Sequence, residues 1–147
     1  MQALFTRIAK NKTIMTTTEN IKFIKLPESF KADLGSFSID PSIELPILLG
    51  KGKDKVEDKD LTVENIVAGM ISVIAHDKDN PNFSYYKAFV LASDPNIVEK
   101  LNQAAIAKEQ RKEFGFAEEL FLAVYHLLPQ SASCINLATL YSYLAVE

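Results

Sequence analysis

The chain has 147 residues, of which 48% are hydrophobic and 24% charged, and its formal net charge at pH 7 is −3. This length and composition fit one globular domain with a modest core and an appended arm. The negative balance gives no broad attraction to phosphate backbones, so a general nucleic-acid binder is not expected. Lys, Asp, Glu or Asn interrupts every helix-length apolar window, so no contact with a membrane is predicted.

The cysteine and glycine content argues against several kinds of site. Cys134 is the single cysteine, so no internal disulfide can form, and His76 and His126 do not give it the spacing of a zinc site. The five glycines form no phosphate-binding loop before a helix. We therefore expect no metal, no cofactor and no nucleotide site, and a reducing, cytoplasmic location.

Residues 1–20 are predicted to be a leader outside the folded domain. The segment up to Thr18 carries Arg7, Lys10 and Lys12 without an acidic residue, and its apolar residues are too scattered for a secretory signal. An organellar presequence is one interpretation. A disordered tail, or a start codon assigned too early with Met15 as the true first residue, explains the segment more simply.

Extended structure is predicted next. Apolar and polar residues alternate over 36–40 and again over 42–47, which is the period of a half-buried strand. Pro41 and Pro46 lack the amide donor needed inside a sheet, so these segments are expected at an edge or as a strap. Residues 21–26 are the candidate pairing partner.

A charged run separates this arm from the rest of the chain. Residues 51–60 contain one apolar side chain among mixed charges, so they cannot bury enough surface to offset their ordering entropy. We expect a solvated linker here, between an extended arm over 21–50 and a helical domain over 61–147.

Helical periodicity begins after Thr62, the expected N-cap. The first helix presents one apolar face and should end near His76, before a cluster of turn formers; that face comprises Val63, Ile66, Val67, Met70, Ile71 and Ile74. A second helix is predicted from Phe83 to Ala92. Asp94 and Pro95 then mark the start of a third.

The third helix is predicted to run to about Lys112, with Gly115 as the left-handed residue that ends it. A fourth follows from Phe116 until Pro129. Ser131 or Ser133 should cap a fifth, whose inward residues are expected to be Ile135, Ala138, Leu140, Tyr141 and Leu144.

The third and fourth helices carry a repeat pattern. Pro95 and Pro129 lie 34 residues apart, which is the period of the tetratricopeptide unit. Residues 98–131 resemble such a unit closely, while the units on either side match loosely. The packing positions that carry the resemblance are Leu101, Ala105, Phe114, Ala117, Phe121 and Pro129.

The resemblance to the tetratricopeptide family implies a mainly α fold: a stack of about five antiparallel helices with an extended or short-β N-terminal arm. It also implies a concave face that binds a protein or peptide. The face positions are Asn65, Ser72, Glu99, Asn102, Ile106, Glu109, Asn136, Leu140 and Tyr143. Asn102 and Asn136 occupy equivalent positions one repeat apart, and as a ladder they would hydrogen-bond an extended backbone.

Three functions remain open. We expect a non-catalytic adaptor or scaffold whose shallow groove binds a partner peptide or helix, with the arm packed on the helices or lying in the groove. The alternative is a small chaperone for an exported or assembling client. A remote alternative is a hydrolytic enzyme that uses His126 with Glu118 or Glu119. A homodimer through the apolar fifth helix is a further option.

Other candidate residues have structural interpretations. Glu118 and Glu119 are expected to be solvated in the first turn of their helix, where its dipole favours acidic side chains. Lys108 belongs to a basic group interleaved with glutamates, which is typical of a solvated helix with surface ion pairs. Cys134 is expected to be a small buried side chain.

Overall fold

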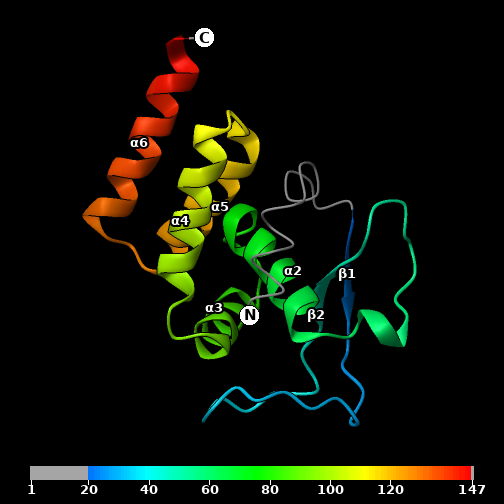
Figure 1. Cartoon of the computed structure of the whole chain (residues 1–147). Coiled ribbons are helices and arrows are strands. Elements are labelled where there is room, and N and C mark those ends of the chain that lie inside the picture. Colours follow the sequence, from blue (N-terminus) through cyan, green and yellow to red (C-terminus); the bar gives the residue numbers. More distant parts are fainter. Residues whose placement is uncertain (1–19, 147) are drawn as a thin grey trace.

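The computed structural model of the chain describes residues 20–146 (Figure 1). Except for Asn20, the predicted leader over 1–20 lies outside the described residues. Within them the protein is mainly helical, with five α-helices and a short two-stranded antiparallel sheet near the N-terminal side. The predicted fold class, mainly α with a short-β arm, is confirmed.

The sheet pairs the two ends of the arm. Strand β1 (Ile21–Ile24) runs antiparallel to β2 (Leu45–Leu48), with Phe23 opposite Pro46. The predicted pairing of the 21–26 segment is thus confirmed. A two-stranded sheet has only edge strands, which is why it tolerates a proline.

The sheet lies against α2 (Val63–His76), and β2 is the strand in contact with it. Leu45 and Ile47 are fully buried there. Gly69 makes this close approach possible, because a Cβ at that position would stand 2.6 Å from the carbonyl oxygen of Pro46. The arm is therefore part of the main hydrophobic core.

Helix α3 (Phe83–Ser93) holds the rest of the arm. The Tyr85 hydroxyl accepts a 2.8 Å hydrogen bond from the Asp40 amide, and the Tyr86 hydroxyl donates one of 2.6 Å to the Glu44 carbonyl. The Phe37 ring also packs against Tyr85, with ring centroids 5.3 Å apart. The arm was expected either to pack on the helices or to lie in the groove, and residues 21–50 pack on the helices.

The charged segment 51–60 is mostly exposed but partly ordered. It ends in a short 3₁₀ helix, η2 (Asp58–Asp60), and the Asp60 carboxylate pairs with Lys53. The Asn65 side chain donates a 2.8 Å hydrogen bond to the Asp60 carbonyl. This bond ties the segment to the first turn of α2.

Helices α4 (Ile97–Gln110), α5 (Phe114–Leu127) and α6 (Ser131–Val146) complete the structure. Helix α2 packs against α3 and α5, and α5 packs in turn against α4 and α6. The sheet and α6 therefore lie at opposite ends of the molecule, with α2 and α5 between them (Figure 1).

The helix boundaries follow the sequence signals closely at α2. The Thr62 hydroxyl accepts a 3.1 Å bond from the Asn65 amide, and the helix ends at His76. Helix α4 begins later than expected, at Ile97, because Asp94 and Pro95 form a turn in which Asp94 accepts from the Asn96 amide.

The packing positions of the best-matched repeat lie between α4 and α5. Leu101, Ala105 and Ala117 are fully buried, and Phe121 nearly so. The small side chains let the two helices approach while the large ones fill the space beside them. Phe114 is only partly buried, and Pro129 is exposed after α5.

The turn between α4 and α5 corrects one prediction. Gly115 lies inside α5, and the left-handed residue is Lys112, with φ of 61°. The Glu113 amide donates to the Lys108 carbonyl and the Lys112 amide to the Glu109 carbonyl, both at 2.9 Å. This is a Schellman cap, which normally has glycine at the left-handed position. The backbone hydrogen bonds thus put the left-handed residue at Lys112, three positions before Gly115.

Gly69→Ala is predicted to destabilise the protein by about 1–3 kcal/mol, because the methyl group would collide with the Pro46 carbonyl and force β2 away from α2. Urea unfolding measures the change. Gly50→Ala is the matched control, since a Cβ there meets no atom within 4 Å. Equal destabilisation of both variants would contradict the close contact.

Lys112→Gly is predicted to stabilise the protein by about 0.5–1 kcal/mol, because glycine adopts positive φ without the steric cost that lysine meets. The midpoint of denaturant unfolding reports the gain. Lys112→Ala removes the same charge but keeps a Cβ, so it should not be stabilising; a gain there equal to that of glycine would disprove the backbone explanation.

Candidate functional site

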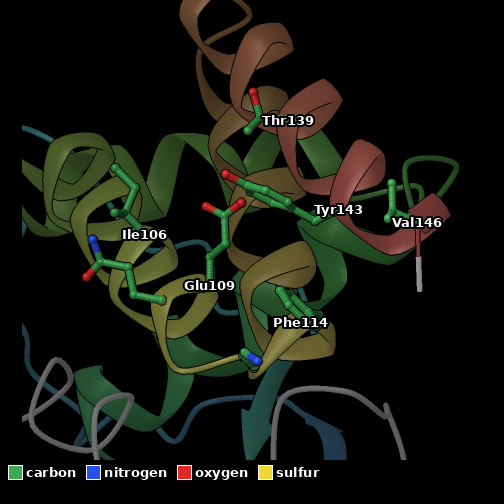
Figure 2. A pocket seen from close by; sticks show the side chains of 8 residues that line it. Ile106, Glu109, Phe114, Thr139, Tyr143 and Val146 are labelled. Carbon is green, nitrogen blue, oxygen red and sulfur yellow. The ribbon is translucent and has the colours of Figure 1, made fainter.

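A groove of about 700 Å³ lies between the C-terminal halves of α4 and α6 (Figure 2). One wall comes from α4, the turn after it and the first residue of α5, the other from α6. Its lining residues are Ile106, Glu109, Gln110, Lys112, Phe114, Thr139, Tyr143 and Val146. Three of the predicted concave-face residues, Ile106, Glu109 and Tyr143, are thus brought together.

Helix α6 gives the groove an uncharged wall. Its sequence contains no Asp, Glu, Lys or Arg, yet most of its side chains are exposed, including Tyr143 at 54% and Val146 at 88%. Large apolar side chains gathered on one exposed element are typical of surfaces that contact another molecule. The groove is therefore the main candidate for a binding site among the described residues.

The predicted inward face of this helix is wrong in four places. Ile135, Ala138, Tyr141 and Leu144 are exposed, and only Ser133 and Leu140 are buried. Helix α6 rests mainly on α5, so a single neighbouring helix covers one narrow side of it. Apolar content alone could not indicate which side that is.

Glu109 supplies the carboxylate of the groove. Its side chain lies between those of Ile106 and Tyr143, within the hollow (Figure 2). The residue is half-buried, and its Oε1 atom is withdrawn from water without a hydrogen-bond donor among the described residues. A carboxylate oxygen in that state is costly unless a donor reaches it.

Asn102 and Asn136 bond to each other rather than forming an open ladder. The Asn136 Nδ2 donates a 3.0 Å hydrogen bond to the Asn102 Oδ1, which joins α4 to α6. A smaller hollow of about 360 Å³ lies nearer the starts of these helices, where Glu99 contributes to its lining. The pair thus connects the two helices that form the walls. Because these side chains bond to each other, fewer of their donors and acceptors remain for a bound peptide.

The other predicted face positions do not reach the groove. Asn65 bonds to Asp60, and Ser72 is 1% exposed between α2 and α5. Leu140 is fully buried on the side of α6 that packs against the rest of the protein. In the family pattern, first helices line one concave surface. Here α2 is covered by the sheet, α3 and α5, so it contributes to the core instead.

A buried polar cluster joins α2 to α5. Ser72 Oγ donates a 2.6 Å hydrogen bond to Glu119 Oε1, and His76 Nε2 lies 3.0 Å from the same oxygen. Glu119 is fully buried, so the prediction that it is solvated is wrong. The partners, four residues apart on α2, are 43 and 47 positions away from Glu119 in the chain, which is why the sequence does not indicate the cluster.

Both ionisable groups of this cluster hold protons more strongly than usual. Burial raises the pKa of Glu119 above its ordinary 4.5, although the hydrogen bonds from His76 and Ser72 act in the opposite sense. The hydrogen bond to Glu119 raises the pKa of His76 above its ordinary 6.5, against the lowering effect of burial. The folded state is therefore favoured at pH values at which these two groups hold their protons.

The arrangement does not assemble a nucleophile with a base. Ser72 donates to the carboxylate rather than to His76, and it is buried away from any substrate. The His126 ring packs edge-on against Phe83 and Tyr125, while Glu118 accepts from Tyr141. The groups proposed for the hydrolytic alternative are therefore not brought together.

Two further expectations are corrected. Lys108 is 2% exposed, paired with Glu113 at 2.8 Å and placed 4.4 Å from the centre of the Phe116 ring, so it is not part of a solvated face. Cys134 is exposed instead of buried, because it lies on the uncovered side of α6. In both cases the tertiary contact determines the burial.

Within residues 20–146, no group of three or more His, Cys, Asp or Glu side chains could hold a metal ion. None of the helices described there combines the length and apolar character required to cross a bilayer. Comparisons with protein-family models, with curated proteins and with solved structures return no match for this chain. The resemblance to tetratricopeptide repeats stays a prediction from the sequence.

The free energy of unfolding is predicted to fall as pH rises above 6.5. Since the pKa of His76 is higher in the folded state, its contribution is fully present below 6.5 and is lost as pH rises through the raised value. The raised pKa of Glu119 likewise makes the free energy of unfolding fall as pH rises, over a lower pH range. Chemical denaturation at a series of pH values measures this slope.

Glu119→Gln should flatten the fall above pH 6.5, because it removes the charge that raises the pKa of His76. His126→Gln is the matched control: burial lowers the pKa of His126, so that histidine titrates below 6.5 and its loss should leave the slope above 6.5 unchanged. An unaltered slope in Glu119→Gln would contradict the assignment.

Proposed function

We propose that this protein is a non-catalytic interaction module that binds an apolar peptide or helix of another protein in the α4–α6 groove. The observation that carries the proposal is the exposed, uncharged helix α6 forming one wall of a groove opposite Ile106. Interfaces are depleted in charge at their centre and enriched in aromatic residues such as Tyr143.

The shape of the site supports a helical or extended occupant. Helices α4 and α6 run side by side in the same direction (Figure 1), and the bond between Asn102 and Asn136 joins them. A groove between two fixed helices can take the apolar face of an amphipathic helix. An adaptor and a chaperone for an assembling client would use the same groove, and we favour the adaptor in the cytoplasm.

A second candidate function is self-association through α6. Ile135, on α6, is 62% exposed, and the helix carries no charge that would repel its copy across a two-fold axis. Sedimentation at increasing concentration tests this: a dimer that Ile135→Lys dissociates would support self-association, and a monomer at all concentrations would exclude it.

Selection of a random displayed peptide library on the purified protein tests the groove. Peptides that bind there should lose more than about tenfold in affinity for Ile106→Asp and for Tyr143→Asp, because a charge would replace an apolar contact. Both side chains are substantially exposed, so the variants are expected to fold, and thermal unfolding checks this.

Leu91→Asp is the matched control, since Leu91 is 42% exposed on α3 and does not line the groove. Binding to this variant should remain at the parent level. If the selected peptides bind all three aspartate variants equally, or if no peptide is selected, the proposed groove function is wrong.

A further inference from the structure

We propose that Glu109 makes the groove selective for partner segments that place a basic side chain, arginine before lysine, next to a bulky apolar anchor. This inference rests on the proposed function, because it names the partner chemistry of the same groove. It begins from the carboxylate itself, which stands in an apolar hollow with one oxygen withdrawn from water and no donor among residues 20–146.

The two lysines close to Glu109 in the sequence do not form a salt bridge with its carboxylate. Lys108 pairs with Glu113 and lies over the Phe116 ring. Lys112 lines the same groove, yet none of the ion pairs formed by the described residues joins it to Glu109. Among residues 20–146 no ion pair neutralises Glu109, so a group that enters the groove can do so.

A second copy of this chain is a poor occupant for the same reason. Its α6 would bring Tyr143 and Val146 as apolar anchors but no basic residue, since that helix contains none. Glu109 would then be covered further while still unpaired, which costs more than leaving it in the open groove. A partner that supplies both an apolar side chain and a cation removes this penalty.

The neighbours of Glu109 indicate how the two features are spaced. Ile106 lies one turn before it on α4, and Tyr143 faces both from α6 (Figure 2). A bound helix reaches this set with an anchor and a cation three or four positions apart. Arginine is favoured because its guanidinium can pair with the carboxylate in a bidentate manner while it stacks on the Tyr143 ring.

The test repeats the peptide selection on the parent protein, Glu109→Gln and Glu109→Lys. The parent should enrich peptides with Arg or Lys three or four positions from a large apolar residue. Glu109→Gln should keep the apolar preference and lose the basic one, and Glu109→Lys should enrich Asp or Glu instead. Asp79→Asn, which removes one exposed negative charge that does not line the groove, should select the same peptides as the parent.

Titration of one selected peptide completes the test. Replacing its basic residue with glutamine should weaken binding to the parent about tenfold or more, and binding to Glu109→Gln by less than twofold or so. Groove-dependent peptides without a basic residue, or equal losses against both proteins, would overturn the inference and leave the groove function standing. Peptides indifferent to Ile106→Asp and Tyr143→Asp would overturn both.

Discussion

The structure depends on the burial of α2 on all sides. Every residue from Ile66 to Ala75 is buried, so this helix has no solvated face over that stretch and can exist only if other elements cover it. Strand β2 covers one side through the close approach of Pro46 to Gly69, and α3 and α5 cover the others. The hydrophobic effect thus makes the N-terminal arm part of the core, since removing it would expose a row of large apolar side chains.

The contact between α2 and α5 contains the polar cluster of Ser72, His76 and Glu119. Glu119 has no exposure at the α2–α5 interface, and the two hydrogen bonds to its Oε1 atom offset part of the cost of burying it. Because the bond to Glu119 raises the pKa of His76, the contact between these helices depends on pH. Ser72 and Glu119 are buried in this contact, whereas the open groove lies elsewhere, between α4 and α6.

That surface follows from an asymmetry in the stack. Helix α5 packs against α2, α4 and α6, whereas α6 makes few contacts with any element other than α5. Its other sides stay open, and where α6 diverges from α4 the gap becomes the groove around Glu109. An uncharged helix that is covered on one side only favours association with another molecule, and the carboxylate opposite it gives that association a preference in charge.

The sequence by itself determined the number of helices after residue 61 and their approximate bounds. Local signals specify α2, because Thr62 caps its first turn and turn formers follow His76, and hydrophobic periodicity gives the same answer. The packing of small against large side chains at Ala117 and Leu101 was also expected from the resemblance to a tetratricopeptide unit. Tertiary structure alone decided which helix faces are covered. Ser72 and Leu140, predicted on the binding face, are buried, whereas Ile135 and Cys134, predicted to be buried, are exposed. The reason is physical: capping and periodicity act over a few residues, whereas burial depends on contacts between residues distant in the chain, such as those of Glu119 with α2.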